Sequence, residues 1–271
     1  MHLVTASGRD EAGCLAYWRQ RGPYRMTALP PFTPYAPLLL RTQPNEARIH
    51  TRRSALEALL ATLEAHFARL SFFVLLPDVR PASWRGWTAT PFYTYLLPLQ
   101  HDDLLERWSG GTRRLFQNHR AAYRVEEGRD PTSILALSAG SYQRHARSLP
   151  GEEARLAQLI ETLRDAGLAR LFTATPLDGS TPEGGVVILQ DGQTAHDWIA
   201  GSTRGPAMTV LLGHTLSCLR DAGIQQFDFV GANTPSIAEF KRHFGPVLTP
   251  YYHLEKITRP ELRLYSRLRG S

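Results

Sequence analysis

The chain has 271 residues, 42% of them hydrophobic and 10% aromatic, which excludes a disordered protein and predicts one large domain or two domains of about 100 to 150 residues. Its formal charge of +6 excludes a strongly acidic protein and suggests an anionic partner. We expect a cytoplasmic protein, because no run approaches the roughly 20 apolar residues of a membrane span, the N-terminus lacks a secretory pattern, and Cys14 and Cys218 have neither disulfide-framework nor zinc spacing.

The first 99 residues predict a mixture of helix and strand. A proline-rich stretch, residues 29–40, predicts an ordered loop that leads into a short strand. Residues 51–67 place leucines at helical spacing and predict an amphipathic helix. The apolar run 71–79 and the β-branched and aromatic run 86–99 each predict a strand.

The second part of the chain predicts a β-α-α-β-β-β-α-β-α-β order after an opening helix. The opening helix covers residues 101–123, with an interruption at Gly110-Gly111. The remaining elements are a strand at 133–138, helices at 139–149 and 152–167, a strand at 169–177, a hairpin at 184–202 that turns at Asp191-Gly192, a helix at 207–223, a strand at 224–231, a helix at 236–246 and a strand at 248–256.

The helix at 236–246, "SIAEFKRHFGP", contains an unusual lysine. Ser236 and Glu239 have the spacing of a capping box, and Ile237, Phe240 and Phe244 form a stripe that predicts the buried face. Lys241 lies outside that stripe. It is one of only two lysines in a chain whose other 29 basic residues are Arg.

Several short motifs recur in an order that resembles a known family. The hairpin 184–202 is followed by "LRDAG", "FDFVG", "IAEFKRHFG" and a closing aromatic strand. This order is similar to the Fem-type peptidoglycan aminoacyltransferases and related acetyltransferase-like proteins of the GNAT superfamily. The resemblance covers most of residues 100–258 and implies a tandem GNAT-like fold, an α/β structure with a mixed sheet in each of two lobes.

The resemblance also implies a domain layout. It predicts a degenerate GNAT-like lobe on the acceptor side at 1–99 and an acyltransferase lobe at 100–258. From the charge distribution we expect the basic tail at 259–271 to pack back on the first lobe and add its positive charge there. The stretch "PPFTPYAP" looks like a proline-rich acceptor loop, which makes Tyr35 a candidate for substrate binding. The helical-hairpin arm of some members is missing, so the likeness does not extend to transfer-RNA binding through such an arm.

A donor site is implied at the start of the helix 207–223. GNAT enzymes hold the coenzyme A pyrophosphate with a glycine-rich turn at a helix N-terminus. Here "STRGPAMTV" keeps Arg204 and Gly205, but Pro206 lacks an N–H and the second glycine is absent. We therefore expect Arg204, Gly205 and Ala207 to contact a donor, either acyl-coenzyme A or aminoacyl-transfer-RNA, with no permanently bound cofactor. The ten His lack ligand spacing, so no metal is expected.

The resemblance implies that the donor lies where two neighbouring strands diverge at one end, here the strands at 196–201 and 226–230. Strict alternation would place His196, Trp198 and Ala200 on one face of the first strand. In the second strand Asp228 lies between two phenylalanines, so its carboxylate needs a partner.

Each candidate on these strands has a structural alternative. His196 or Asp228 could act as the general base that acyl transfer to an amine requires. Otherwise His196 is a polar edge residue beside a turn, and Asp228 is a structural acid that fixes the following "GANT" loop. Trp198 and Asn233 are candidates for substrate binding.

The resemblance assigns Lys241 to the substrate. The lysine of the family's F-K-x-x-F-G motif lies near the substrate, where an ammonium can meet a phosphate or a developing oxyanion. The alternative is that the lysine stem merely covers its helix.

Two functions of different class follow. One is an acyl- or aminoacyl-transferase that acts on a small-molecule or cell-wall-precursor amine. The other is a non-catalytic protein that docks on RNA or acidic lipid, with peripheral membrane contact, because residues 1–99 carry a charge of +5 and the tail +3. A solvated surface explains these charges equally well.

Overall fold

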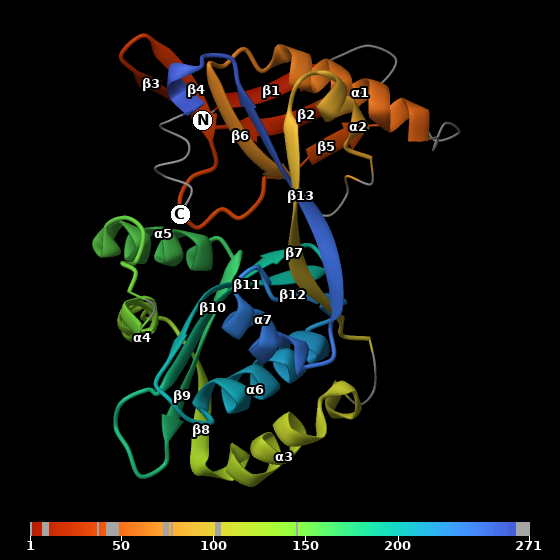
Figure 1. Cartoon of the computed structure of the whole chain (residues 1–271). Helices are drawn as coiled ribbons and strands as arrows, with labels where there is room; N and C mark the ends of the chain where they lie inside the picture. The colour runs from red at the N-terminus through yellow and green to blue at the C-terminus, as the bar shows by residue number, and fades with distance from the viewer. Residues whose placement is uncertain are drawn as a thin grey trace. The chain divides into compact units, whose positions relative to one another are not determined.

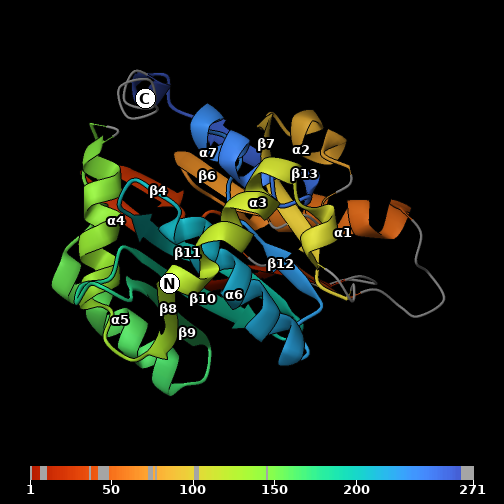
Figure 2. The ribbon, with the colours of Figure 1, turned by 90° about the horizontal axis from the view of Figure 1, so that it is seen from below.

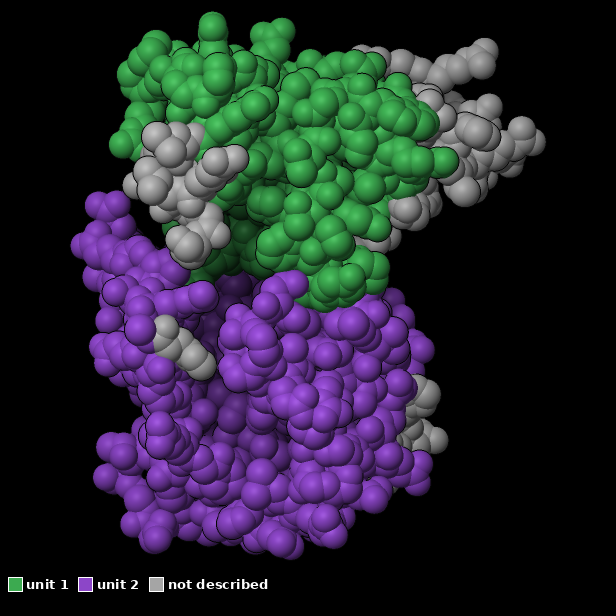
Figure 3. Space-filling view, viewed as in Figure 1, with its two compact units in different colours: residues 1–93, 250–271 green, residues 94–249 purple. Residues whose placement is uncertain are grey.

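The computed structural model describes residues 2–6, 11–36, 38–41, 49–72, 76, 78–100, 104–144 and 146–263. The chain forms two compact units: unit 1 contains residues 1–93 and 250–271, and unit 2 contains residues 94–249 (Figure 3). The predicted domain bounds of 1–99 and 100–258 stay a prediction. Within the described residues, no helix is both long and apolar enough to cross a bilayer.

Unit 1 packs two short helices against strands. Its elements are β1 (His2–Ala6), β2 (Glu11–Ala16), β3 (Trp18–Arg21), β4 (Tyr24–Ala28), β5 (Leu38–Arg41), α1 (Ile49–Thr62), β6 (Phe67–Phe72), α2 (Arg80–Trp84) and most of β13 (Val247–Ile257). The strands run in the orders β1-β2-β5 and β3-β4-β6-β13. The leucines of α1 are buried in one cluster with residues of β2, β6 and α2.

The start of the tail packs within unit 1. Leu262 is buried with Met26 and Phe67, and the Tyr24 hydroxyl donates a hydrogen bond of 3.1 Å to the Glu261 carboxylate. The predicted return of the tail to the first lobe can be followed only to Arg263, because residues 264–271 lie outside the described residues.

Unit 2 is a mixed sheet with helices on both faces. Its strands are β7 (Thr88–Pro98) from Thr94 onward, β8 (Tyr123–Gly128), β9 (Ala169–Pro176), β10 (Gly184–Asp191), β11 (Thr194–Ser202) and β12 (Gln226–Asp228), in the order β7-β12-β11-β10-β9-β8. The first part of β7, up to Tyr93, belongs to unit 1. Its helices are α3 (Gly110–His119), α4 (Thr132–Arg144), α5 (Glu153–Asp165), α6 (Ala207–Asp221) and α7 (Pro235–Arg242), with 3₁₀ turns at Leu104–Arg107 and Arg120–Ala122. Helices α4 and α5 cover one face, and α3 and α6 cover the other (Figures 1 and 2).

The strand predicted at 133–138 is wrong, because these residues belong to α4. The Asp130 carboxylate accepts hydrogen bonds from the Thr132 N–H and hydroxyl, which favours a helix start there. Ile134, Leu135 and Ser138 then bury one helical face. The first strand of the predicted order is instead β8, which begins at Tyr123, the last residue of the expected opening helix.

Two other boundaries differ from the predictions. The first strand after α1 begins at Phe67 and not at Ser71, since α1 ends at Thr62. In α7 the predicted capping box is wrong: Thr234 is the N-cap, and the Glu239 carboxylate instead binds Arg242. Lys241 is the buried residue of α7.

Candidate active site

The site lies where the ladder between β11 and β12 ends. The two strands pair in parallel from Thr194 opposite Gln226 to His196 opposite Asp228, which confirms that they are neighbours. β12 ends at Asp228, whereas β11 continues to Ser202. The pairing therefore stops at these two side chains and leaves the rest of β11 without a ladder on that side among the described strands.

A β-bulge at Trp198 changes the orientation of side chains along β11. Val187 of β10 pairs with Ile199 and Ile188 pairs with Asp197, so Trp198 has no partner on β10. The predicted strict alternation is consequently wrong. It would place the odd-numbered Ala195 and the even-numbered Ala200 on opposite faces, but both pack against the same core cluster. On the opposite face Gly201 approaches α4 so closely that a Cβ atom would lie 2.2 Å from the Ser138 nitrogen.

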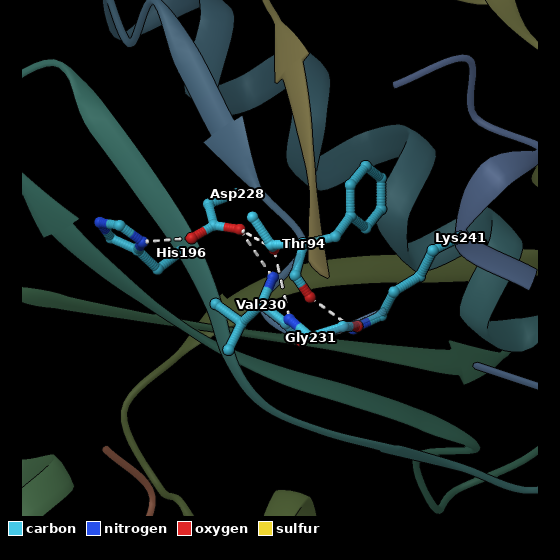
Figure 4. A network of polar contacts seen from close by, with 7 residues as sticks. Thr94, His196, Asp228, Val230, Gly231 and Lys241 are labelled. Atoms are coloured by element: carbon cyan, nitrogen blue, oxygen red, sulfur yellow. Dashed lines mark hydrogen bonds and ion pairs between the residues drawn. The ribbon is translucent and has the colours of Figure 1, made fainter. Parts of the chain in front are cut away.

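Asp228 is the centre of a hydrogen-bond network. Its Oδ1 accepts from the Thr94 hydroxyl of β7 at 2.5 Å and from the Val230 N–H at 2.9 Å. Its Oδ2 lies 3.1 Å from Nδ1 of His196 (Figure 4). The Gly231 N–H donates to the Thr94 hydroxyl oxygen at 3.3 Å. These contacts fix the carboxylate and aim one of its oxygens at the imidazole.

Burial sets the ionisation of this pair. Asp228 is fully buried, and desolvation raises the pKa of its carboxyl to about 7 from the ordinary 3.8, although the N–H of Val230 opposes the shift. Burial lowers the pKa of His196, whose side chain is 18% exposed. The imidazole is thus neutral near pH 7, and its second nitrogen points away from Asp228 (Figure 4).

Lys241 reaches the loop that follows Asp228. Its ammonium donates to the carbonyl oxygens of Phe229, Val230 at 2.9 Å and Gly231 at 3.3 Å. Val230 and Gly231 have φ angles of 48° and 82°, a left-handed conformation that is unfavourable for a β-branched residue. The three carbonyls occupy the three N–H donors of the ammonium, so Lys241 stabilises this strained loop.

A second buried carboxylate balances the charge of Lys241. Oδ2 of Asp197 lies 3.8 Å from the ammonium, and both side chains are nearly inaccessible. Oδ1 of Asp197 has no hydrogen-bond partner among the described residues. Burial raises the pKa of Asp197 and lowers that of Lys241, so desolvation opposes the charged forms of both groups.

The structure brings together His196, Asp228 and Lys241 but not all of the predicted residues. Trp198 is the bulge residue, and Asn233 lies in the loop between β12 and α7. Arg204 and Gly205 precede α6, which begins at Ala207. Tyr35 belongs to unit 1, where its ring packs edge-on against Tyr251 at 5.2 Å between centroids.

Thr94 and the partnership of Asp197 with Lys241 were not predicted. Thr94 is one of three threonines in β7, and it is completely buried. A buried hydroxyl needs a hydrogen-bond partner, but the sequence of β7 does not distinguish Thr94 from Thr88 and Thr90. No group of three or more His, Cys, Asp or Glu side chains placed to hold a metal occurs in the part of the chain that the structure describes.

The raised pKa of Asp228 predicts a pH-dependent stability. Between about pH 4 and pH 7 the carboxyl is ionised in the unfolded chain but protonated in the folded protein. Its contribution to the unfolding free energy is therefore fully present below about pH 4 and falls as the pH rises to 7, by up to about 4 kcal/mol at 1.36 kcal/mol per pKa unit. Urea unfolding across this range measures the slope.

Two variants isolate the contribution of this carboxyl. Asp228→Asn should flatten the slope, because the amide does not titrate. The matched substitution of an exposed carboxylate, Asp178→Asn, should leave the slope unchanged. Identical slopes in wild type and Asp228→Asn would contradict the prediction.

Comparison with known proteins identifies the family and the fold. A family model described as an acetyltransferase (GNAT) domain matches residues 103–242. No curated protein matches the sequence. Among solved structures, FemX is similar over 99% of this chain and 91% of its own, with 13% identity and a TM-score of 0.67.

Two further structures share the fold. The C-terminal domain of a putative lysylphosphatidylglycerol synthetase from Agrobacterium fabrum is 14% identical, with 94% of this chain and 83% of that chain covered and a TM-score of 0.56. L-PGS from Bacillus licheniformis is 11% identical, with 100% and 89% covered and a TM-score of 0.58. These likenesses confirm the predicted mixed α/β fold, and the family model confirms the predicted GNAT superfamily.

Proposed function

Because the chain belongs to the acetyltransferase (GNAT) domain family, we propose that it transfers an acyl or aminoacyl group from an activated donor to an amine acceptor, with its chemistry in unit 2. The observation that carries this proposal is the pair formed by Asp228 and His196 at the end of the β11–β12 ladder. A buried carboxylate bound to one nitrogen of a partly exposed imidazole is the arrangement that makes the other nitrogen a base.

The proposed reaction starts with the acceptor amine. Above its pKa of about 7, ionised Asp228 accepts the Nδ1–H of His196, which leaves a lone pair on Nε2. Nε2 takes a proton from the amine, the amine nitrogen bonds to the donor carbonyl carbon, and the bond from that carbon to the leaving sulfur or oxygen breaks. His196 is the catalytic base, Asp228 orients it, and Lys241 positions the loop that holds Asp228.

Backbone groups are proposed to stabilise the developing oxyanion. From Asp197 onward β11 has no ladder on its β12 side among the described strands. N–H groups at such an edge can donate to the oxygen of a donor carbonyl.

The donor is proposed to bind at the start of α6. An α-helix leaves its first N–H groups without intrahelical partners, and here they follow Gly205, which has a φ of 131°. Together with Arg204 these groups fit a phosphate, although Pro206 supplies no N–H. Both acyl-coenzyme A and aminoacyl-transfer-RNA remain candidates, since one protein of similar fold is named a putative lysylphosphatidylglycerol synthetase. Trp198 and Asn233 of unit 2 remain proposed acceptor contacts, and the role of Tyr35 in unit 1 stays a separate prediction.

Thermal unfolding with each donor tests this function. A donor at one hundred times its Kd should stabilise the protein by about 2.7 kcal/mol and so raise the Tm. The donor that raises the Tm is then incubated with a panel of amines, and the amide product is measured by mass spectrometry. If neither donor class raises the Tm and no amide forms, the proposal is wrong and the non-catalytic alternative is preferred.

A further inference from the structure

Unit 1 contains a cavity that the proposed reaction does not use. It has a volume of about 840 Å³, which is large enough for an organic ligand. The wall is built from the end of α1, the segment that leads into β6, the end of α2, and strands β4 and β13. Its lining residues all belong to unit 1, so this cavity is separate from the site formed by His196 and Asp228.

Three cationic side chains from different elements line this cavity. They are Arg25 on β4, Arg85 after α2, and Lys256 on β13, the second of the two lysines. The lining contains a single carboxylate, that of Glu64. The wall is therefore predominantly positive at neutral pH.

The three cations are poorly neutralised by the protein. The Arg25 guanidinium lies 4.0 Å from the centroid of the Trp18 ring, and Lys256 Nζ lies 6.0 Å from that of Trp87; neither contact involves a carboxylate. Neither side chain forms an ion pair within the described part of the chain. Arg85 lies 3.8 Å from Glu57, a partly exposed pair of the kind that contributes little.

A fixed histidine adds a neutral donor. Nδ1 of His66 accepts the Arg25 N–H at 2.8 Å, and the His66 N–H donates to the Arg25 carbonyl at 2.8 Å. In the neutral ring the proton consequently resides on Nε2, which is left to donate. Apolar Leu60 and Leu63 and the 58% exposed Trp84 complete the wall.

We propose that unit 1 binds an organic phosphate in this cavity, with Arg25, Arg85 and Lys256 contacting the phosphate and the apolar wall contacting the organic group. A phosphate offers several acceptor oxygens and a negative charge, which suit a lining that carries cations from three separate elements. The cavity is larger than an inorganic phosphate ion, and its apolar wall would have no contact with such an ion alone. The phosphate could belong to a soluble nucleotide or to a lipid headgroup.

Binding measurements with two probes test the site. Isothermal titration calorimetry uses ADP as the soluble phosphate, and flotation uses phosphatidylcholine vesicles with and without phosphatidylglycerol. Lys256→Gln removes one charge from the β13 part of the lining while keeping most of the side-chain stem. Arg85→Gln does the same at the part of the lining that follows α2. Each should weaken binding about tenfold, the factor expected for one charge-assisted hydrogen bond.

Controls separate this cavity from general charge and from the donor site. Arg19→Gln removes an exposed charge of unit 1 outside the cavity, and Arg204→Gln alters the proposed donor site. The inference is supported if both cavity variants weaken binding and both controls bind as the wild type does. Binding of ADP would identify a soluble nucleotide as the source of the phosphate, and binding only to vesicles that contain phosphatidylglycerol would identify a lipid headgroup. It is overturned if neither probe binds, if Arg19→Gln weakens binding equally, or if only Arg204→Gln does.

Discussion

His196→Gln is expected to lower the rate of acyl transfer about a thousandfold while leaving the fold intact. Glutamine can still meet Asp228 through its amide, but it cannot take a proton from the acceptor amine. General base catalysis typically contributes a factor of about 100 to 10,000, and the nearly buried position of this imidazole makes replacement by a bulk-water base inefficient. The measurement is single-turnover formation of the amide product with the donor that the thermal assay identifies.

His214→Gln is the matched control for this substitution. His214 is an exposed histidine of α6, so its replacement should leave the rate unchanged. The wild-type rate should also rise as the pH increases through about 7, where Asp228 ionises and accepts the Nδ1–H. If His196→Gln and His214→Gln transfer the acyl group equally fast, His196 is not the base.

Asp228→Asn tests the role of the carboxylate without removing the imidazole. The amide oxygen can accept from Thr94 and Val230, which leaves the amide N–H₂ facing Nδ1. Nδ1 must then act as an acceptor, so the proton moves to Nε2 and the base is lost. The rate should therefore fall even though the geometry is preserved.

Local patterns were sufficient to predict most of unit 2. The hairpin of β10 and β11 and the helix α6 have strong periodicity and turn signals, and the structure contains them within a few residues of the predicted bounds. The apolar run at 133–138 failed because a short apolar segment suits a strand and a buried helix equally. Contacts of its neighbours, such as those of Asp130, favoured the helix.

The geometry of the candidate site depends on contacts between residues that are distant in the sequence, which a short stretch of sequence cannot predict. The bulge at Trp198 is a property of the register between β10 and β11, and strict alternation within β11 alone cannot reveal it. Thr94 lies 134 residues before Asp228, so their hydrogen bond requires the tertiary fold. Lys241 was noticed from composition, but the apolar pattern of its helix predicted that Ile237 would be buried. The structure instead buries Lys241, which lies on the same helical face, and leaves Ile237 38% exposed.

Lys241→Met is expected to lower the free energy of unfolding by about 3 to 5 kcal/mol, the cost typical of leaving a buried charge without its partner. Methionine keeps much of the stem but leaves the carbonyls of residues 229–231 without their shared donor. It also leaves the carboxylate of Asp197 buried without a cation. The strained loop at Val230 loses its support at the same time. Urea unfolding at pH 7 measures the change.

Further substitutions separate the ammonium's charge from its shape. Lys241→Arg keeps the charge, but a planar guanidinium cannot converge on the three carbonyls as an ammonium does, so most of the loss should remain. Adding Asp197→Asn to Lys241→Met should restore part of the stability, because the uncompensated charge is removed. Arg242→Met, an exposed change on the same helix, should stay within about 0.5 kcal/mol of wild type.

The two roles considered for Lys241 predict different effects of Lys241→Met on stability and on the transfer rate. If the ammonium positions the loop, stability falls in Lys241→Met, and the transfer rate falls with it because the loop adjoins Asp228. If the ammonium instead meets a substrate phosphate or oxyanion, as the resemblance implies, the rate is lost while stability is kept. All three N–H donors are already directed at backbone carbonyls, so we expect the first outcome. Wild-type stability in Lys241→Met would assign the lysine to the substrate instead.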